Sequence, residues 1–172
     1  MIESKTADQV PLVTVDSLYE LKRLRRAGVE AVIWDRSLPR GLHEWLERVS
    51  PECWPTARYV LPSEKTEDCL ERLFDTTGVP RSPQRAWLIR DISSLGSAIS
   101  AMFETPYIRL RVEAVTGDAC RRFHVDTVLA RMVCTYVGPG TQYGVADDEH
   151  VPEDIQHLPL CIPKQSFEEH WD

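Results

Sequence analysis

A histidine and an aspartate two residues apart form the clearest candidate chemical site in this sequence. His124 and Asp126 end the stretch 120–126, which has the residue pattern of a β-strand. Because side chains two residues apart on a strand point to the same face, the imidazole and the carboxylate can converge on one point. One imidazole and one carboxylate are two of the three ligands in the facial triad that holds non-haem Fe(II). The pair therefore predicts a metal site without naming a reaction.

Nearby cysteines offer a second way to hold a metal. Cys120 precedes His124 by four residues, and Cys134 follows it. Together with Asp126 they would supply thiolate, imidazole and carboxylate ligands, a set that suits Zn(II) better than Fe(II). In a regular strand, however, Cys134 would fall on the apolar face, where a cysteine commonly fills the core. We therefore predict His124, Asp126 and Cys120 as the metal ligands and keep both Fe(II) and Zn(II) open.

Arginines accompany this pair on the neighbouring β-patterned stretches. Arg109 and Arg111 alternate with apolar residues, and Arg122 and Arg131 lie on the two stretches that follow. If these stretches are neighbours in one sheet, its polar face is lined with arginine, which binds carboxylates well because its planar guanidinium can donate two parallel hydrogen bonds. This face is predicted to bind a small acidic ligand. The alternative is the wet side of an antiparallel sheet with surface ion pairs such as Arg109–Glu113.

The rest of the sequence predicts the elements that must position these residues. Helical periodicity with capping or breaking residues predicts helices over residues 17–27, 41–49, 63–77 and 82–103. Apolar runs and alternation predict strands over residues 29–34, 58–61, 107–115, 120–126 and 131–137. The tail from Asp147 onward is rich in proline, acid and histidine, and is predicted to be mostly irregular.

These elements indicate an α+β fold, in which a helical N-terminal half packs on an antiparallel C-terminal sheet. Residues 1–14 are predicted to form a flexible arm, and residues 15–172 a single domain.

Composition excludes several classes of function. The chain has 172 residues and a formal net charge of −7, which argues against a dedicated nucleic-acid-binding protein. No apolar run has membrane-spanning length and no signal pattern is visible, so we expect a cytoplasmic protein without membrane partners. Its five scattered cysteines favour reduced thiols or a metal site over disulfides. Phosphate-binding glycine loops and serine nucleophile motifs are lacking.

Four segments carry a resemblance to a known family: Ala31–Arg36, Arg109–Glu113, Cys120–Asp126 and Cys134–Thr141, of which the last two together are the most specific. On these residues the chain resembles a bacterial family of uncharacterised proteins, domain-of-unknown-function family 1826, over most of its length from about Val15. Members of this family are often encoded near zinc-homeostasis genes, and the resemblance therefore implies a link to zinc.

The order His-x-Asp, Arg131, Gly-Thr141 is also similar to the first half of the jelly roll of 2-oxoglutarate/Fe(II) oxygenases. That resemblance implies a jelly-roll (double-stranded β-helix) sheet, in which a later histidine completes the triad and a later arginine binds 2-oxoglutarate. No arginine follows Arg131, which argues against 2-oxoglutarate, and the distal histidine would have to be His150, His157 or His170. Such a chain would be an oxygenase-like enzyme, or a truncated or inactive one.

Three functions therefore remain open. The first is an Fe(II) oxygenase-like protein with a His-x-Asp site, and the second is a non-enzymatic zinc-binding protein of zinc homeostasis. The third is a metal-free module that binds an acidic ligand through Arg109, Arg111, Arg122 and Arg131, with Thr141 beside them.

Overall fold

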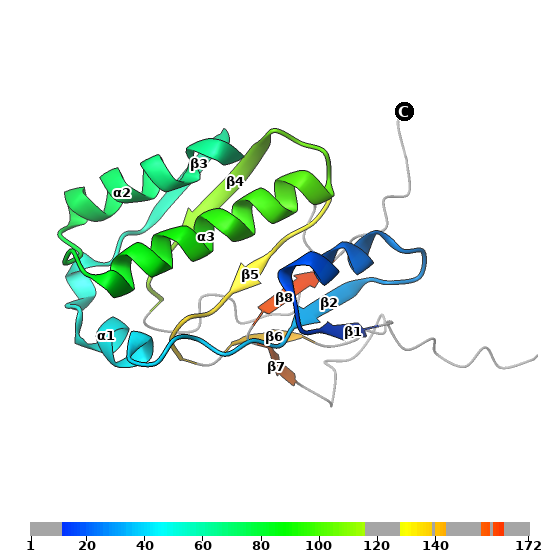
Figure 1. Cartoon of the computed structure of the whole chain (residues 1–172), viewed down its shortest axis with the longest axis horizontal. Coiled ribbons are helices and arrows are strands. Elements are labelled where there is room, and N and C mark those ends of the chain that lie inside the picture. Colours follow the sequence, from blue (N-terminus) through cyan, green and yellow to red (C-terminus); the bar gives the residue numbers. More distant parts are fainter. Residues whose placement is uncertain (1–11, 116–127, 139, 144–155, 159, 164–172) are drawn as a thin grey trace, which may run out of the picture. The chain divides into compact units, whose positions relative to one another are not determined.

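The computed structural model describes residues 12–115, 128–138, 140–143, 156–158 and 160–163. The chain divides into two compact units, the first made of residues 1–36 and 122–172 and the second of residues 37–121 (Figure 1). The second unit is thus one continuous segment of the sequence, and the first unit is made of the segments that precede and follow it. Of the predicted arm, residues 1–14, the structure describes Leu12 onward, and Leu12 begins the first strand.

A four-stranded sheet forms the centre of the first unit. Its order is β1-β2-β8-β5; β1 and β2 are parallel, and the other neighbours are antiparallel. Ala31 and Val32 are fully buried and Ile33 nearly so, as the short apolar run predicts for a central strand. The bounds are Leu12–Val15 for β1, Ala31–Trp34 for β2, Val133–Cys134 for β5 and Leu160–Pro163 for β8.

The helix predicted after residue 16 is a 3-10 helix, η1, over Leu18–Arg25. Its two fully buried side chains are Leu21 and Leu24. Because a 3-10 helix has three residues per turn, residues three apart lie on the same side, which matches this spacing. Gly28 ends the segment with a positive φ of 78°.

The prediction of an irregular tail is wrong for two segments. The strands β7 (Gln156–Leu158) and β8 both lie in it, and β8 occupies an inner position of the four-stranded sheet. β7 pairs with β6 (Thr141–Tyr143) in a separate two-stranded antiparallel sheet. Short runs flanked by proline and acidic residues carry too little periodicity to show a strand, so only pairing with a partner reveals them.

The second unit consists of two long helices and a pair of strands. β4 is antiparallel to β3, α3 packs against both β4 and α2, and Figure 1 shows α3 crossing in front of β4. The helices confirm the sequence prediction closely. The bounds are Leu42–Arg48 for α1, Pro51–Cys53 for the 3-10 turn η2, Ala57–Pro62 for β3, Ser63–Lys65 for the 3-10 turn η3, Thr66–Thr77 for α2, Pro83–Met102 for α3 and Tyr107–Val112 for β4.

Local signals explain where α3 begins and how closely it approaches β4. The Ser82 hydroxyl accepts a hydrogen bond from the Arg85 backbone N–H at 3.0 Å, and Pro83 occupies the first turn. A Cβ atom added at Gly96 would lie 2.9 Å from Cδ1 of Ile108, so only glycine fits this crossing without a shift. The close approach of α3 to β4 is therefore helped by the absence of a side chain at Gly96.

A buried arginine joins the end of α2 to the start of α3. The Arg85 side chain is 3% exposed and lies 2.7 Å from Glu71 Oε2 and 2.8 Å from Asp75 Oδ1. Its guanidinium also donates to the carbonyl oxygens of Val79 and Glu71, at 2.9 and 3.0 Å. A buried charge needs such partners, and here they fix the angle between the two helices.

The α+β class is confirmed, but the predicted antiparallel C-terminal sheet is not. Strands lie in both halves of the chain: β1, β2 and β3 precede the long helix α3, and the sequence predicted β2 and β3. β4 pairs with β3 and β5 pairs with β8, so the two stretches expected to be neighbours belong to different sheets. The described strands do not show a jelly roll. No helix in the described part of the chain is long and apolar enough to cross a membrane.

Candidate functional site

The β3–β4 pair has one buried face and one exposed face. On the buried face the register places Leu61 opposite Ile108, and both side chains are less than 10% exposed. The other face alternates with it, as required by the period of two in a strand. That exposed face carries three directly opposed pairs, which are Arg58–Arg111, Val60–Arg109 and Pro62–Tyr107.

Three arginines, Arg58, Arg109 and Arg111, make up what we call the arginine face. Arg58 and Arg111 are directly opposite, where Cβ atoms of an antiparallel pair lie about 4.5–5.5 Å apart, and Arg109 is diagonal to Arg58. Among the described residues the only acid that pairs with them is Glu113, which forms an ion pair with Arg111. The arginine face therefore has an excess of positive charge in a protein whose net charge is −7.

An exposed apolar group lies beside the arginine face. Val60 is 71% exposed and Tyr107 is 58% exposed, on the same side of the two strands. A partner that covered these two side chains would be stabilised, because removing apolar area from water is favourable. The exposed side of β3–β4 thus combines charge at one end with apolar surface at the other.

The described arginines of the predicted ligand-binding group belong to two units. Arg109 and Arg111 are exposed on β4, as the alternation predicts, and Arg131 is exposed just before β5 in the other unit. Arg122 lies outside the described residues. Arg58 was missed, because only the strand register shows that it faces Arg111.

The predicted metal ligands Cys120, His124 and Asp126 lie outside the described residues. Thr141 starts β6, and only its backbone is described. In the described segments no three His, Cys, Asp or Glu side chains are grouped so that they could hold a metal ion. The His-x-Asp pair therefore stays a prediction from the sequence.

Cys134, the second thiol considered for zinc, lies in a polar and aromatic cluster of the first unit. Its Sγ accepts a hydrogen bond from Nη2 of Arg36 at 3.1 Å. The Arg36 guanidinium lies 4.7 Å from the ring centre of Trp34 and 5.8 Å from that of Tyr136. Cation–π contacts of this length hold the guanidinium in place. The cluster brings together the segments 31–36 and 134–141, two of those that carry the family resemblance.

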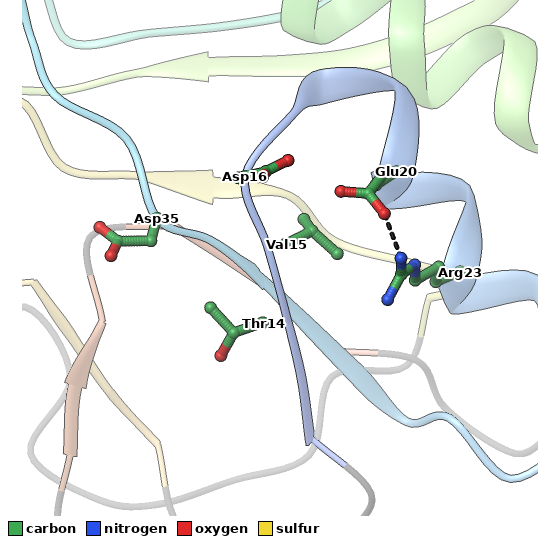
Figure 2. Close-up of a pocket in the computed structure, with 6 residues that line it drawn as sticks. All are labelled: Thr14, Val15, Asp16, Glu20, Arg23 and Asp35. Carbon is green, nitrogen blue, oxygen red and sulfur yellow. Dashed lines mark hydrogen bonds and ion pairs between the residues drawn. The ribbon is translucent and has the colours of Figure 1, made fainter.

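A shallow hollow of about 390 Å³ lies at the end of β1 in the same unit. Figure 2 shows the Glu20 carboxylate turned toward Arg23, with which it forms an ion pair, while the Asp35 carboxylate points away from that pair. The Asp16 and Glu20 carboxylates face each other (Figure 2), but Glu20 is paired with Arg23 and Asp35 lies apart, so among the described residues the hollow offers no group of three acids that could hold a metal ion. It is lined by Thr14, Val15, Asp16, Glu20, Arg23 and Asp35.

Comparison with known proteins gives one match. The family model described as "Protein of unknown function (DUF1826)" matches residues 15–167. The chain belongs to this family. The match includes residues of both units, so the DUF1826 assignment applies to nearly the whole described structure. No curated protein and no solved structure matches the chain. The family description names no activity.

Proposed function

We propose that the protein is a binding module that recognises an anionic partner through the arginine face. The observation that carries this proposal is the directly opposed pair of Arg58 and Arg111. Like charges directly opposite each other destabilise a sheet, by up to about 1 kcal/mol relative to a neutral pair. An anion placed between two guanidinium groups reverses the sign of that interaction, because each can donate charge-assisted hydrogen bonds to it.

The surface charge around these strands supports the same proposal. A solvated sheet face usually alternates acids and bases across its strands, since opposite charges stabilise the pairing. This face carries three arginines and one glutamate, although the whole chain has 27 acidic and 20 basic residues. The local charge is thus positive, whereas the net charge of the protein is negative, and this favours binding of an anion over a cation at the arginine face.

The buried side of the strands supports binding by holding the arginines in position. Ile108 and Leu110 alternate with the arginines of β4 and are buried on the side of α3. Because the backbone is fixed by this packing, less conformational entropy is lost when an anion is bound. Arginine is suited to such a site since it stays charged at any physiological pH.

Anion binding can be tested with a fluorescein-labelled hexaglutamate peptide, followed by fluorescence anisotropy at low salt. The double variant Arg58→Gln/Arg109→Gln should weaken binding at least tenfold, since each hydrogen bond to a charged group contributes about 1.5–3 kcal/mol. The matched control is Arg72→Gln/Arg90→Gln, which removes the same charge from exposed arginines of α2 and α3. Equal losses in the two variants would show general electrostatic attraction and overturn the proposal.

The sequence motif supports a second proposal, that the protein binds a metal through His124, Asp126 and Cys120. Fe(II) in an oxygenase-like jelly roll and Zn(II) in a non-enzymatic cytoplasmic protein are its two forms. Imidazole, carboxylate and thiolate are ligands of both metals, and thiolate favours zinc.

Elemental analysis of protein purified without chelator tests the metal proposal. Stoichiometric zinc or iron that is lost in His124→Ala, but kept in the exposed control His43→Ala, would support it. Iron accompanied by consumption of 2-oxoglutarate would point to the oxygenase form. Absence of metal under every loading condition would refute both forms and leave the anion-binding proposal untouched.

A further inference from the structure

The side chains on the exposed side of β3–β4 follow an order along the strands that the binding of a simple anion would not require. From one end to the other, β3 presents Arg58, Val60 and Pro62, and β4 presents Arg111, Arg109 and Tyr107. The first pair is basic, the second is mixed, and the third is apolar. At about 3.4 Å per residue the three pairs extend over roughly 14 Å. We call Val60, Pro62 and Tyr107 the apolar end of this surface.

From this order we infer that the partner is an extended acidic segment of another protein, with carboxylates followed by an apolar or aromatic side chain. The inference rests on the proposed function and specifies its partner. An extended chain presents every second side chain on one side, with a period of about 6.8 Å, which is the spacing of the three pairs. Carboxylates would lie against the guanidinium groups while the apolar side chain covers part of the apolar end.

Charge and exposure favour a protein segment over nucleic acid. A nucleic acid brings a long row of phosphates, and its binding requires an extended basic surface. Here three arginines lie on a protein with a net charge of −7, so phosphates beyond the arginine face would be repelled. A peptide with two carboxylates places its charge only where the arginines are. Its apolar side chain also gives a role to the exposed Val60 and Tyr107, which a small anion leaves in water.

The backbone of these strands is also suited to an extended partner. In the part of the chain that the structure describes, β3 and β4 pair only with each other. Within the described residues each strand therefore has an edge whose N–H and C=O groups are not used in a ladder, and peptides commonly bind by adding a strand to such an edge. A strand added there would keep the alternation that brings its acidic side chains to the arginine face.

Three labelled probes at equal concentration test the inference. The first is the alternating peptide Ser-Glu-Ser-Glu-Ser-Phe-Ser, the second its isomer Ser-Ser-Glu-Glu-Phe-Ser-Ser, and the third hexaglutamate. We expect the alternating peptide to bind at least fivefold more tightly than its isomer, because only in the alternating peptide do both glutamates and the phenylalanine share one side, whereas in the isomer one glutamate points to the opposite side. Tyr107→Ser should weaken binding of the alternating peptide about tenfold and leave that of hexaglutamate unchanged.

Controls separate failure of the inference from failure of the proposed function. Tyr19→Ser, which removes a tyrosine that is 74% exposed in the other unit, should change nothing. If hexaglutamate binds through Arg58 and Arg109 but the two peptide isomers bind alike, the proposed function stands and the inference is wrong. Tighter, Tyr107-dependent binding of single-stranded DNA would also overturn it. If none of the probes binds the wild-type protein, both the proposed function and the inference are refuted.

Discussion

Replacing Arg85 by alanine should lower the free energy of unfolding of the second unit by about 4 kcal/mol. The Arg85 side chain is 3% exposed, and its guanidinium donates to the carbonyl oxygens of Val79 and Glu71. Each hydrogen bond from a charged donor contributes at least about 1.5 kcal/mol, which gives about 3 kcal/mol for the two carbonyls. Burial of the aliphatic stem, which is lost on truncation, adds about 1 kcal/mol.

The ion pairs of Arg85 add little to that figure. The carboxylates of Glu71 and Asp75 are 48% and 41% exposed, so water can solvate them once the arginine is gone. Arg81 provides a matched control, because its Nη2 lies 2.7 Å from the same Asp75 carboxylate while its side chain is 81% exposed. Arg81→Ala should therefore cost less than about 1 kcal/mol.

Urea unfolding followed by far-ultraviolet circular dichroism is the suitable assay, because all three described α-helices lie in the second unit. With an m-value of about 2 kcal/mol/M, a loss of 4 kcal/mol lowers the midpoint by about 2 M. The shift in urea midpoint should be much larger for Arg85→Ala than for Arg81→Ala, although both arginines contact the Asp75 carboxylate. Equal shifts for Arg85→Ala and Arg81→Ala would show that burial and the carbonyl contacts do not govern stability here.

Three further predictions concern the same unit. A hydrogen bond from Arg81 lowers the pKa of Asp75, so its stabilising effect is complete above the unfolded-state pKa near 4 and is lost as pH falls through the folded-state value; the gap in urea midpoint between wild type and Asp75→Asn should therefore shrink as the pH is lowered below about 4, and a gap that stays constant would contradict the assignment. Burial raises the pKa of the Cys69 thiol, so mass-mapped labelling by a disulfide reagent at pH 8 should be slower at this residue than in a cysteine tripeptide, and an equal rate would exclude burial of the thiol. Gly96→Ala should stabilise by less than the gain of about 1 kcal/mol that the higher helix propensity of alanine provides, because the new Cβ meets Cδ1 of Ile108 and the end of that side chain must move. In an Ile108→Val background, which lacks that atom, Gly96→Ala should be more favourable, and simple additivity of the two changes in urea midpoint would refute the contact.

The helices of the second unit could be predicted from the sequence because their signals are local. Ser82 and Pro83 mark the start of α3, and Gly78, which has a φ of 82°, ends α2. Each of these residues acts on its own turn, so its effect does not depend on the rest of the fold. The alternation of β4 is equally local, and it correctly indicated that Arg109 and Arg111 are exposed.

Strand partners could not be predicted in the same way. β4 pairs with β3, although two helices separate them in the sequence, and this register alone reveals Arg58 opposite Arg111. Arg85 was missed for a related reason. Its position on α3 looks like that of any charged surface residue, and only the carbonyl oxygens from another segment explain how it is buried. Both cases depend on contacts between distant segments, which periodicity does not record.

The inner position of β8 has a consequence for the order in which the chain is made. Ile33 of β2 pairs with Cys161, which is 128 positions further along the chain. At about 5–20 residues per second, a ribosome needs about 6–26 seconds to synthesise that interval. During this time the second unit, which is continuous, can fold completely, whereas β2 keeps an unpaired edge of buried-type residues. A nascent chain arrested before residue 160 should therefore hold a folded second unit and an aggregation-prone first unit, so the synthesis of β8 determines when the edge of β2 is protected from association with other chains.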